Sequence, residues 1–323
     1  MAESPGGRVP LALLPTPLEP MDRLADALGG PRLLVKRDDC TGLALGGNKA
    51  RKLEYLCAEA CTQGCDTLVT GGGPQSNHVR MTAAAANRLG LECRIALAGR
   101  EPPVASGNLL LDHLLGAQLH FIGPADYYEI EHGIEEVAAR AARDGRRPFA
   151  IPVGGASVTG VTAYADAADE LLDQLGGAVV DWVVVADGSG GTHAGLVAGL
   201  GDRVRVLGID VGTRPDLDEV VPRLAAEAAV RTGRPDPPSE ALVDHDHFGT
   251  GYGAVTEPMV EALRLAARVE GIVLDPVYSG KAMAGLIAAI RDGRIGDDET
   301  VVFWHTGGAP ALFAERYSSV FGS

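Results

Sequence analysis

Short apolar runs alternate with alanine-rich patterns of helical spacing along nearly the whole chain. We expect strands at residues 33–36, 67–70, 94–97, 118–122, 149–153, 182–186, 204–209 and 300–304. Helical patterns lie at residues 77–89, 134–142, 161–175, 192–200, 257–269 and 282–290. When strands and helices alternate, the chain crosses over the sheet between strands, so neighbouring strands run parallel and helices cover both faces. The sequence therefore predicts an α/β fold built on open, twisted parallel sheets.

The length of the chain and one irregular segment bear on its organisation. A chain of 323 residues is long enough for two domains of ordinary size. Residues 213–245 interrupt the alternation, because they contain five prolines and many acidic residues. We expect this segment to form a helix and loop insertion on the surface.

Charge and composition exclude several classes of partner. The net charge of −15 disfavours nucleic acid and anionic membrane surfaces as partners. No stretch is apolar enough to span a membrane, and residues 1–10 lack the apolar core of a signal peptide, so we expect a cytoplasmic protein. Cys57, Cys61 and Cys65 recur every four residues, which matches no common zinc pattern. We expect small buried hydrophobes there and no metal site.

Residues 46–56 place a lysine at the junction of a loop and a helix. They read Gly-Gly-Asn-Lys-Ala-Arg-Lys-Leu-Glu-Tyr-Leu, in which two glycines make a turn and Asn48 is expected to cap the helix. Lys52 lies one helical turn after Lys49 and repeats its positive charge. The pair suits a lysine that forms an imine and a second cation that meets a phosphate. The alternative is a capped surface helix with two solvated lysines.

A glycine-rich turn at residues 71–80 precedes the helical pattern of 77–89. It reads Gly-Gly-Gly-Pro-Gln-Ser-Asn-His-Val-Arg. The first backbone N–H groups of a helix have no partner within the helix, so such a start binds a carboxylate or phosphate well. Ser76 and Asn77 add polar side chains beside them. Ser76 could instead only cap the helix, but three preceding glycines favour close approach of a ligand.

A second glycine-rich turn at residues 187–195 reads Asp-Gly-Ser-Gly-Gly-Thr-His-Ala-Gly. Successive N–H groups of such a turn wrap a phosphate, and Ser189 and Thr192 add hydroxyl donors. A dinucleotide-binding turn is the alternative, with Asp210 at the end of the next strand. However, His193 stands where the last glycine of the dinucleotide pattern would fall. A phosphate monoester fits better.

Two further residues, Tyr278 and Thr306, lie at strand-to-loop positions, where parallel-sheet proteins place ligand groups. With them, the sequence contains a loop lysine, a helix start shaped for a carboxylate and a cradle for one phosphate. Pyridoxal phosphate chemistry needs this set and also a partner for the pyridine nitrogen, which a hydroxyl at the end of a strand could supply. We therefore expect pyridoxal 5'-phosphate as the cofactor and a small amino acid as the substrate.

The sequence resembles the D-cysteine desulfhydrase and 1-aminocyclopropane-1-carboxylate (ACC) deaminase family, of the tryptophan-synthase-β type (fold type II). The resemblance covers nearly the whole chain. It is carried by the motifs described above together with Pro-Thr-Pro-Leu-Glu at 15–19, Lys-Arg-Asp-Asp at 36–39 and His-Thr-Gly-Gly-Ala-Pro at 305–310.

The resemblance implies a role for each residue that matches the family pattern. Lys49 becomes the Schiff-base lysine, and Ser76 and Tyr278 act with it as catalytic residues. Cofactor contacts are implied for Lys49, Lys52, Asn77, Gly188, Ser189, Gly190, Gly191, Thr192 and Thr306. Substrate contacts are implied for Gln75, Ser76, Asn77, His78, Tyr278 and Ser279.

The family also implies a domain organisation. Residues 1–53 and 156–323 would form a large cofactor-binding domain, and residues 54–155 a smaller inserted α/β domain. The cofactor would lie in the cleft between the two domains. A homodimer is the usual state in the family.

Two positions favour one activity within the family. Deaminase members have a glutamate directly after the active-site tyrosine and a leucine in the last motif, where this chain has Ser279 and Thr306. Both differences favour α,β-elimination, with D-cysteine as the first substrate, over opening of a cyclopropane ring. ACC deaminase remains an alternative. Residues 39–43 resemble those of L-cysteate sulfo-lyases, a further alternative, and a non-catalytic pyridoxal phosphate-binding protein is one from another class.

Overall fold

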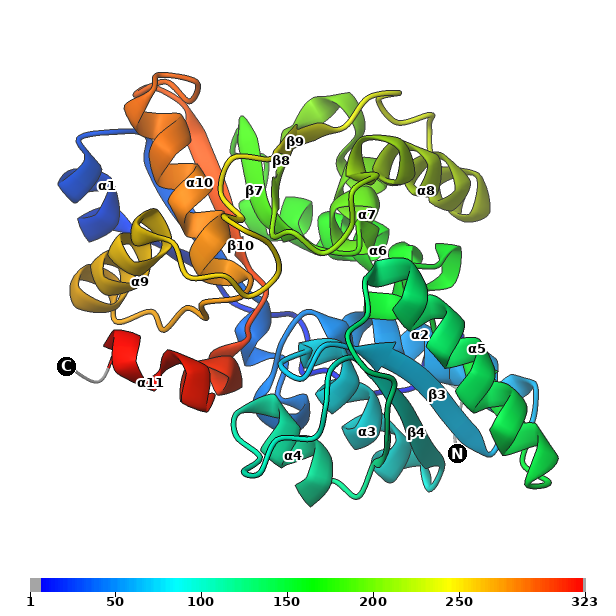
Figure 1. The fold of residues 1–323 in the computed structure, drawn as a ribbon. Coiled ribbons are helices and arrows are strands. Elements are labelled where there is room, and N and C mark those ends of the chain that lie inside the picture. The colour runs from blue at the N-terminus through cyan, green and yellow to red at the C-terminus, as the bar shows by residue number, and fades with distance from the viewer. Residues whose placement is uncertain (1–6, 322–323) are drawn as a thin grey trace.

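The computed structural model describes residues 7–321, which form two β-sheets with helices on both faces of each (Figure 1). The strands are β1 (Leu18–Pro20), β2 (Arg32–Arg37), β3 (Thr67–Gly72), β4 (Glu92–Leu97), β5 (Gln118–Phe121), β6 (Pro148–Ala150), β7 (Trp182–Asp187), β8 (Arg205–Asp210), β9 (Leu242–Asp244) and β10 (Thr300–His305). The helices are α1 (Asp22–Leu28), α2 (Lys49–Thr62), α3 (Asn77–Leu89), α4 (Asn108–Leu114), α5 (Tyr127–Arg143), α6 (Val158–Leu175), α7 (Gly191–Leu200), α8 (Leu217–Thr232), α9 (Glu257–Glu270), α10 (Ser279–Arg291) and α11 (Glu315–Phe321).

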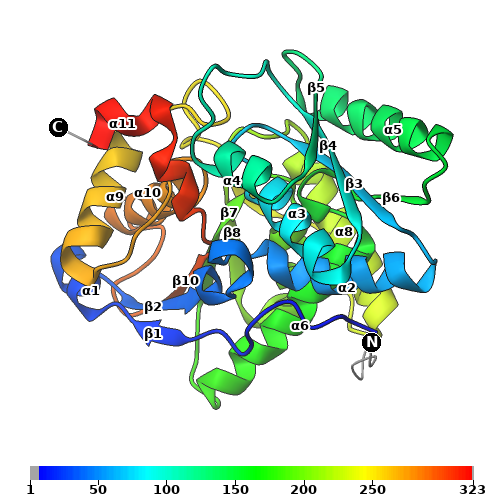
Figure 2. The ribbon, with the colours of Figure 1, turned by 90° about the horizontal axis from the view of Figure 1, so that it is seen from below.

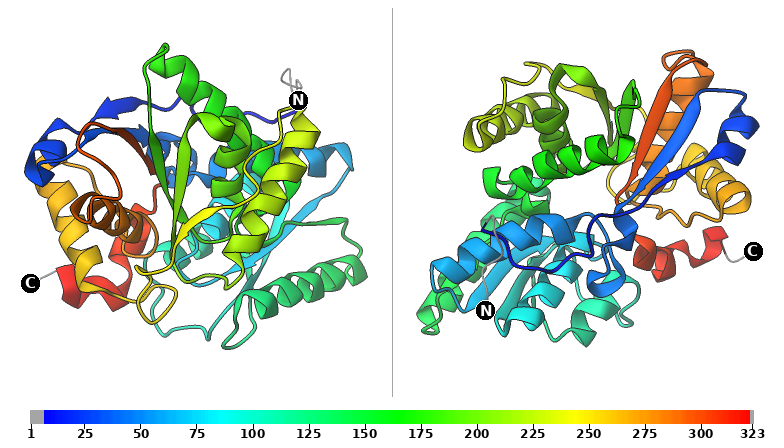
Figure 3. Two further views of the ribbon diagram at one scale, coloured as in Figure 1. Left: turned by 90° about the horizontal axis from the view of Figure 1, so that it is seen from above. Right: turned by 180° about the vertical axis from the view of Figure 1, so that it is seen from behind.

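The larger sheet has six strands in the order β1-β2-β10-β7-β8-β9. Only the pair β1 and β2 is antiparallel in this sheet. Successive side chains of a strand point to opposite faces. On β10, Val301 and Phe303 join the core formed with α1, α9 and α10, whereas Val302 and Trp304 join the core formed with α6, α7 and α8. Figure 3 shows the two groups of helices on opposite sides of this sheet.

The smaller sheet has four parallel strands in the order β5-β4-β3-β6. Helix α5 packs on one face, where Ile130 and Ile134 meet Val69 of β3. Helices α2 and α3 cover the other face, which includes Leu68. In Figure 2, α5 and α3 are seen on opposite sides of β3 and β4. The expected α/β class with helix-covered parallel sheets is confirmed.

Helix α2 connects the two layers of the molecule. It packs both on α3, which covers the smaller sheet, and on α6, which covers the larger one. The first residue of α2 is Lys49. The predicted imine-forming lysine therefore lies where the two sheets and their helices meet.

Several elements differ from the expectation. Helix α5 begins at Tyr127 because Asp126 and Glu129 form a reciprocal capping box, which the alanine pattern does not reveal. The surface insertion expected at residues 213–245 is wrong. Its helix, α8, buries Val220 and Val221 in the core beside α6 and α7, and β9 forms an edge of the larger sheet.

The two sheets use the chain unequally. All four strands of the smaller sheet lie between residues 67 and 150, whereas the larger sheet uses strands from both sides of that segment. This topology is compatible with the expected division into residues 1–53 plus 156–323 and residues 54–155. The division itself stays a prediction. Among residues 7–321, no helix combines the length and the apolar character needed to cross a membrane.

Candidate active site

One interior cavity contains most of the residues predicted to form the site. It lies between the ends of strands from both sheets and the starts of α2, α3 and α10. Its lining residues are Asn48, Lys49, Ser76, Asn77, His78, Val153, Gly154, Ala186, Gly188, Ser189, Thr213, Tyr278 and Thr306. Four separate sequence motifs therefore meet at one place.

Lys49 stands at the first position of α2 and lines the cavity. Burial lowers the pKa of Lys49 to about 8, although the nearby Asp187 carboxylate acts in the opposite direction. The expected side-chain cap by Asn48 is wrong, because its amide donates to the Thr192 hydroxyl instead, at 3.0 Å. The N–H of Asn48 donates to the backbone oxygen of Thr306, also at 3.0 Å. Asn48 thus connects the start of α2, where Lys49 lies, to the start of α7 and to the residue after β10.

A buried polar network fixes the start of α2. The Arg51 guanidinium donates to Asp38 at 2.9 Å and to Glu170 at 2.8 Å. Burial acts against ionisation of Asp38, but Arg51 holds the pKa of this carboxyl below its ordinary value. The Tyr164 hydroxyl bonds to Asp38 and lies 3.1 Å from the Asn48 carbonyl oxygen. Ion pairs buried in this way fix geometry more than they stabilise the fold.

Lys52 is a buried cation beside the predicted phosphate turn. Its side chain is fully buried and donates to the Gly154 carbonyl at 3.2 Å, and within residues 7–321 it forms no ion pair. Burial, together with the charge of Lys49, lowers the pKa of Lys52 far below its ordinary value. A Cβ on Gly191 would stand 2.7 Å from the Lys52 Nζ. A buried amine without an ion-pair partner, beside a glycine-lined helix start, fits an anion such as a phosphate, which would favour the charged form of the lysine.

All four lysines of the chain lie inside the molecule. Lys36, Lys52 and Lys281 are fully buried, and Lys49 lines the cavity. The basic residues on the outer surface are therefore arginines and histidines.

The turn after β7 is held in shape by Asp187. One oxygen of this carboxylate accepts the N–H of Gly190 at 3.0 Å, and the other accepts the Nδ1 of His193 at 2.7 Å. His193 is fully buried and also reaches the Val206 carbonyl. Asp210 accepts from Gly212 N–H and His245, so it is not free to bind a ribose. These contacts support a single phosphate rather than a dinucleotide.

At the start of α3, Ser76 and Asn77 face the cavity. The Ser76 hydroxyl accepts the Val79 N–H at 3.4 Å, so this residue is the N-cap of α3 and lines the cavity as well. The Asn77 side-chain oxygen accepts from Arg80 at 3.1 Å and from Asn108 at 3.0 Å. Because both donors occupy the oxygen, the Asn77 NH₂ group remains as a donor toward a ligand.

His78 presents an acceptor nitrogen. Thr70 donates its hydroxyl proton to the Ile151 carbonyl, so the His78 Nε2, 3.0 Å from the Thr70 oxygen, must be the donor of that pair. Its Nδ1 is buried and has no partner among the described residues. Burial, followed by the charges of Lys49 and Lys52, lowers the pKa of His78 far below its ordinary value, so the ring is neutral.

Tyr278 is paired with a residue that the sequence did not single out. The Tyr278 and Tyr252 hydroxyls lie 2.6 Å apart, and the rings meet edge to face at 5.8 Å between centroids. Burial raises the pKa of both phenols above the ordinary value. Both hydroxyls are therefore protonated at neutral pH.

Two predicted substrate residues do not line the cavity. The Gln75 side chain is directed to α4, where it donates to the Ser106 carbonyl at 3.0 Å and accepts the Asn108 N–H at 2.9 Å. The Ser279 hydroxyl is fully buried and donates to Asp275 at 2.6 Å. Neither side chain reaches the cavity, because neighbouring backbone and carboxylate groups compete for its hydrogen bonds.

Sequence reasoning missed the Val153–Gly155 turn and Thr213. A Cβ on Gly154 would stand 2.3 Å from the Ser189 hydroxyl and 3.7 Å from the Lys49 Nζ, so only glycine leaves room there for a ligand. The Thr213 hydroxyl is buried without a partner among residues 7–321, 3.1 Å from the position of a Cβ on Gly188. Of these two features, only the Val153–Gly155 turn had a signal in the sequence, and that signal was its glycine.

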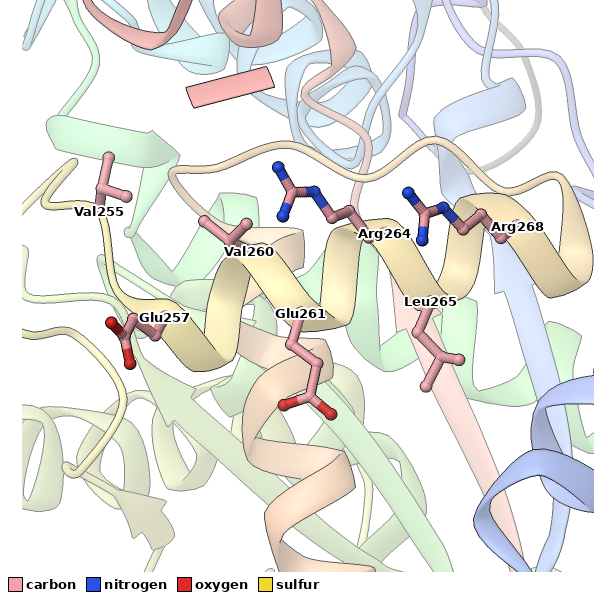
Figure 4. A pocket seen from close by; sticks show the side chains of 7 residues that line it. All are labelled: Val255, Glu257, Val260, Glu261, Arg264, Leu265 and Arg268. Atoms are coloured by element: carbon pink, nitrogen blue, oxygen red, sulfur yellow. The ribbon is translucent and has the colours of Figure 1, made fainter. Parts of the chain in front are cut away.

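Other hollows contain none of these residues. One of them lies over α9 (Figure 4). Its volume is about 550 Å³, whereas that of the interior cavity is about 50 Å³. Its walls include the exposed Arg264 and the Glu261 that pairs with Arg291. It lacks buried polar groups and carries no chemistry. In the part of the chain that the structure describes, no group of three or more His, Cys, Asp and Glu side chains could hold a metal ion.

The fold and the cavity define an α/β enzyme with an interior lysine beside a phosphate cradle. Residues 9–307 match the family described as pyridoxal-phosphate dependent enzyme. D-cysteine desulfhydrase of Klebsiella pneumoniae (strain 342) is 44% identical in an alignment of 321 residues that covers 95% of this chain and 95% of that one. The chain therefore belongs to the family of pyridoxal-phosphate dependent enzymes.

Solved structures agree with this assignment. The crystal structure of an ACC deaminase homologue is similar with a TM-score of 0.90 and 37% identity, over 97% of this chain and 96% of that one. A fungal L-serine ammonia-lyase from Rhizomucor miehei shares the fold, with a TM-score of 0.70 and 17% identity over 97% of this chain and 98% of that one. The cofactor is pyridoxal phosphate, and the residues around Lys49, Lys52 and the glycine turn fit it.

Proposed function

We propose that this protein is a D-cysteine desulfhydrase, which converts D-cysteine and water to pyruvate, ammonia and hydrogen sulfide. The observation that carries the proposal is the 44% identity with the Klebsiella enzyme of that name over 95% of both chains. The substrate class, a small amino acid, agrees with the cavity, which has donors for a carboxylate at the start of α3.

Bound pyridoxal phosphate supplies an electron sink for the pair left at the substrate α-carbon. The Lys49 amine is the group to which we assign the covalent link. Lys52 and the N–H groups at the start of α7 would hold the phosphate, and the Asn77 NH₂ would donate to a ring oxygen. Thr306 would meet the ring nitrogen with a hydroxyl, which does not hold that nitrogen protonated.

Proton transfer at the α-carbon has two candidate groups. Lys49 is one, since burial lowers its pKa to about 8 and so a usable fraction is neutral near neutral pH. Ser76 is the other, because its hydroxyl lines the same cavity. Substrate handedness decides between them, because an anchored carboxylate fixes the direction of the α C–H bond.

Loss of the β-substituent completes the elimination. The Cβ–S bond breaks as the α-proton leaves, and the sulfur departs as hydrogen sulfide. The remaining enamine takes up water and loses ammonia to give pyruvate. The Tyr278 hydroxyl is protonated, because burial raises its pKa, and it can donate to a departing group or to the carboxylate.

ACC deaminase is the second candidate, since the homologue of that name is close in structure. Deaminase members have a glutamate, an additional acid or base, directly after the tyrosine. At that position this chain has Ser279, whose hydroxyl is bonded to Asp275. L-cysteate lyase activity is a further alternative, which differs in the leaving group, sulfite, and in the handedness of the substrate.

A substrate panel tests the proposal. D-cysteine, L-cysteate, β-chloro-D-alanine, D-serine and 1-aminocyclopropane-1-carboxylate are each incubated with the holoenzyme. Pyruvate, 2-oxobutyrate, sulfide and sulfite are measured. We expect pyruvate with sulfide from D-cysteine, and pyruvate from β-chloro-D-alanine. Release of 2-oxobutyrate from the cyclopropane substrate without sulfide from D-cysteine would overturn the proposal, and a cofactor spectrum unchanged by all five compounds would indicate a non-catalytic binding protein.

The proposal includes the organisation that the resemblance implies. We infer a homodimer, a cytoplasmic location and the division into residues 1–53 plus 156–323 and 54–155. Light scattering of the purified protein tests the first, and limited proteolysis tests the last.

A further inference from the structure

Lys281 is a fully buried lysine outside the cavity, and its ammonium group faces three backbone carbonyls. The Lys281 Nζ lies 2.9 Å from the Phe248 oxygen, 3.1 Å from the Gly251 oxygen and 3.3 Å from the Val211 oxygen. A carbonyl only accepts hydrogen bonds, so three of them require three N–H donors. The ammonium form supplies three, whereas the neutral amine has two. Lys281 therefore acts as an internal cation.

Two of the three carbonyls, those of Phe248 and Gly251, belong to one loop, and the third, that of Val211, follows the end of β8. Residues 245–256 connect β9 to α9 and contain Gly249 at a φ of +69° and Gly251 at a φ of +139°. A Cβ on Gly212 would stand 2.9 Å from the carbonyl carbon of Gly251, so the loop lies backbone to backbone against the end of β8. Converging carbonyl oxygens repel one another unless a positive charge lies between them. Lys281 supplies that charge.

The same loop delivers Tyr252 to the site. Its two neighbours are both fixed through their carbonyl oxygens: Gly251 by Lys281, and Gly253 by the Tyr317 hydroxyl at 2.9 Å and by Arg316 at 3.0 Å. Tyr252 then meets the Tyr278 hydroxyl at 2.6 Å. Its ring also lies 3.0 Å from the position of a Cβ on Gly73, in the turn before α3.

Lys281 also belongs to the first turn of α10, which starts directly after Tyr278. It is thus linked to both members of the tyrosine pair, through the helix to Tyr278 and through the Gly251 carbonyl to Tyr252. We propose that Lys281 is a positioning residue, whose ammonium holds residues 245–253 against β8 and α10 so that Tyr252 orients the Tyr278 hydroxyl toward the substrate. This inference rests on the proposed function only for its activity readout.

The charge of Lys281 persists near neutral pH despite its burial. Burial lowers the pKa of Lys281 to about 8, while the carboxylates of Asp210 and Asp275 raise it and Arg316 lowers it further. The charge is not part of an ion pair within the described residues, so the groups in direct contact with it are carbonyl dipoles. A small cation of similar size is then able to replace it.

The first experiment replaces the charge. K281M keeps the apolar stem of the side chain and removes the ammonium. R291M on the same helix is the matched control, since Arg291 is exposed and its one ion pair within residues 7–321 is with Glu261. We expect K281M to keep the cofactor absorbance and to lose about 10-fold in kcat, similar to Y252F, because it acts through Tyr252. R291M should match the parent protein. Wild-type kcat in K281M would overturn the proposal.

Chemical rescue separates a positioning role from a purely structural one. Ammonium or methylammonium ions fit between the three carbonyls, whereas tetramethylammonium is too large and has no N–H. We expect the first two to restore part of the activity of K281A, whose short side chain leaves room for the ion, and to leave the parent protein unchanged. Equal effects of all three ions, or none of any, would contradict the cation role.

Hydrogen exchange gives a readout that needs no substrate. In the holoenzyme, K281M should increase amide exchange in residues 245–253 and leave residues 188–192 unchanged. If the wild type is inactive on D-cysteine but the exchange of the loop rises as expected, the proposed function fails and the Lys281 inference stands. If D-cysteine is consumed normally by the wild type and exchange in K281M is unaltered, the proposed function stands and the Lys281 inference fails.

A second variant, K281Q, covers a failure of K281M to fold. It retains two N–H donors without charge. If neither variant folds until ammonium is added, the cation role is supported. If neither folds in any salt, Lys281 has a structural role and the proposal is wrong. Where K281M does fold, it should cost less activity in a Y252F background than alone, because both act through Tyr252; additive losses would contradict this route.

Discussion

The Tyr252 and Tyr278 hydroxyls are hydrogen-bonded at 2.6 Å although the two residues are 26 positions apart in the chain. One of the two protons lies between the oxygens, so the pair has one free proton to offer to a ligand. Tyr278 lines the cavity, and Tyr252 closes the pair from the loop before α9. Tyr278, which the sequence predicted as a catalytic residue, is therefore one member of a hydrogen-bonded tyrosine pair.

This tyrosine pair leads to a first prediction. Y278F should lower kcat by about 10²-fold or more, within the range for loss of a proton-transfer group. Y252F should have a smaller effect, about 10-fold, because it leaves the Tyr278 hydroxyl present but free to rotate. Steady-state kinetics with D-cysteine measures both, and the cofactor spectrum should stay unchanged in both. Equal kcat in Y252F and the parent protein would remove Tyr252 from this pair.

The second prediction concerns the covalent link. Borohydride treatment of the holoenzyme should fix the cofactor to Lys49, and with four lysines in the chain, mass spectrometry of peptides identifies the residue without ambiguity. K49A should lose the near-visible band of the linked cofactor and all turnover. K52A should mainly weaken retention of the cofactor, because it removes the cation beside Gly191. Cofactor found on any other lysine contradicts the assignment.

The third prediction is a pH dependence of cofactor capture by the apoenzyme. Burial lowers the pKa of Lys49 to about 8, and the neutral amine is the nucleophile. The capture rate should therefore be low at pH 6.5, rise through pH 8 and level off above it. D187N should move the rise to lower pH, because the Asp187 carboxylate raises the pKa of Lys49. Stopped-flow absorbance measures the rate, and a profile that falls with pH is incompatible with this account.

The fourth prediction tests the phosphate cradle. In G191A the added methyl group would stand 2.7 Å from the Lys52 Nζ. We expect Kd for the cofactor to rise by about 10-fold or more, since 1.4 kcal/mol is a factor of ten. G296A is the control, because Gly296 has an ordinary φ and its nearest neighbour, at 3.3 Å, is the Asp298 side chain. Equilibrium titration gives both values, and equal affinities would place the phosphate elsewhere.

The fifth prediction separates two roles of Ser76. S76A removes the cap of α3, which costs about 0.5–2 kcal/mol of stability. If the hydroxyl also takes part in catalysis, kcat should fall by 10²-fold or more while the cofactor affinity stays within a few-fold. Thermal unfolding, titration and kinetics distinguish these effects. An unaltered kcat with reduced stability would leave Ser76 as a helix cap alone.

Much of this architecture is readable from the sequence because local chemistry determines it. Helix α3 spans Asn77–Leu89 as predicted, since Ser76 caps its start and Gly90 ends it in a left-handed conformation. The glycine turn after β7 was found for the same reason. The structure of such motifs is determined by residues that are adjacent in the sequence.

The predictions that failed concern contacts between residues far apart in the sequence. Tyr252 lies in a loop without periodicity, and its position depends on Lys281, nearly thirty residues further along the chain. The side chains of Gln75 and Ser279 were expected in the cavity, but Asn108 and Asp275 compete for them. Spacing in the sequence indicates which residues are near the site. It does not decide between rival hydrogen-bond partners.

The placement of the lysines has a chemical consequence. Pyridoxal phosphate carries an aldehyde, which condenses with any accessible primary amine, whereas a guanidinium does not form the same adduct. Within residues 7–321 three of the four lysine side chains are fully buried and the fourth opens on the cavity. Stray condensation with side chains on the outside of the folded protein is thus avoided by composition, and the aldehyde meets one side-chain amine, at the place where its chemistry is used.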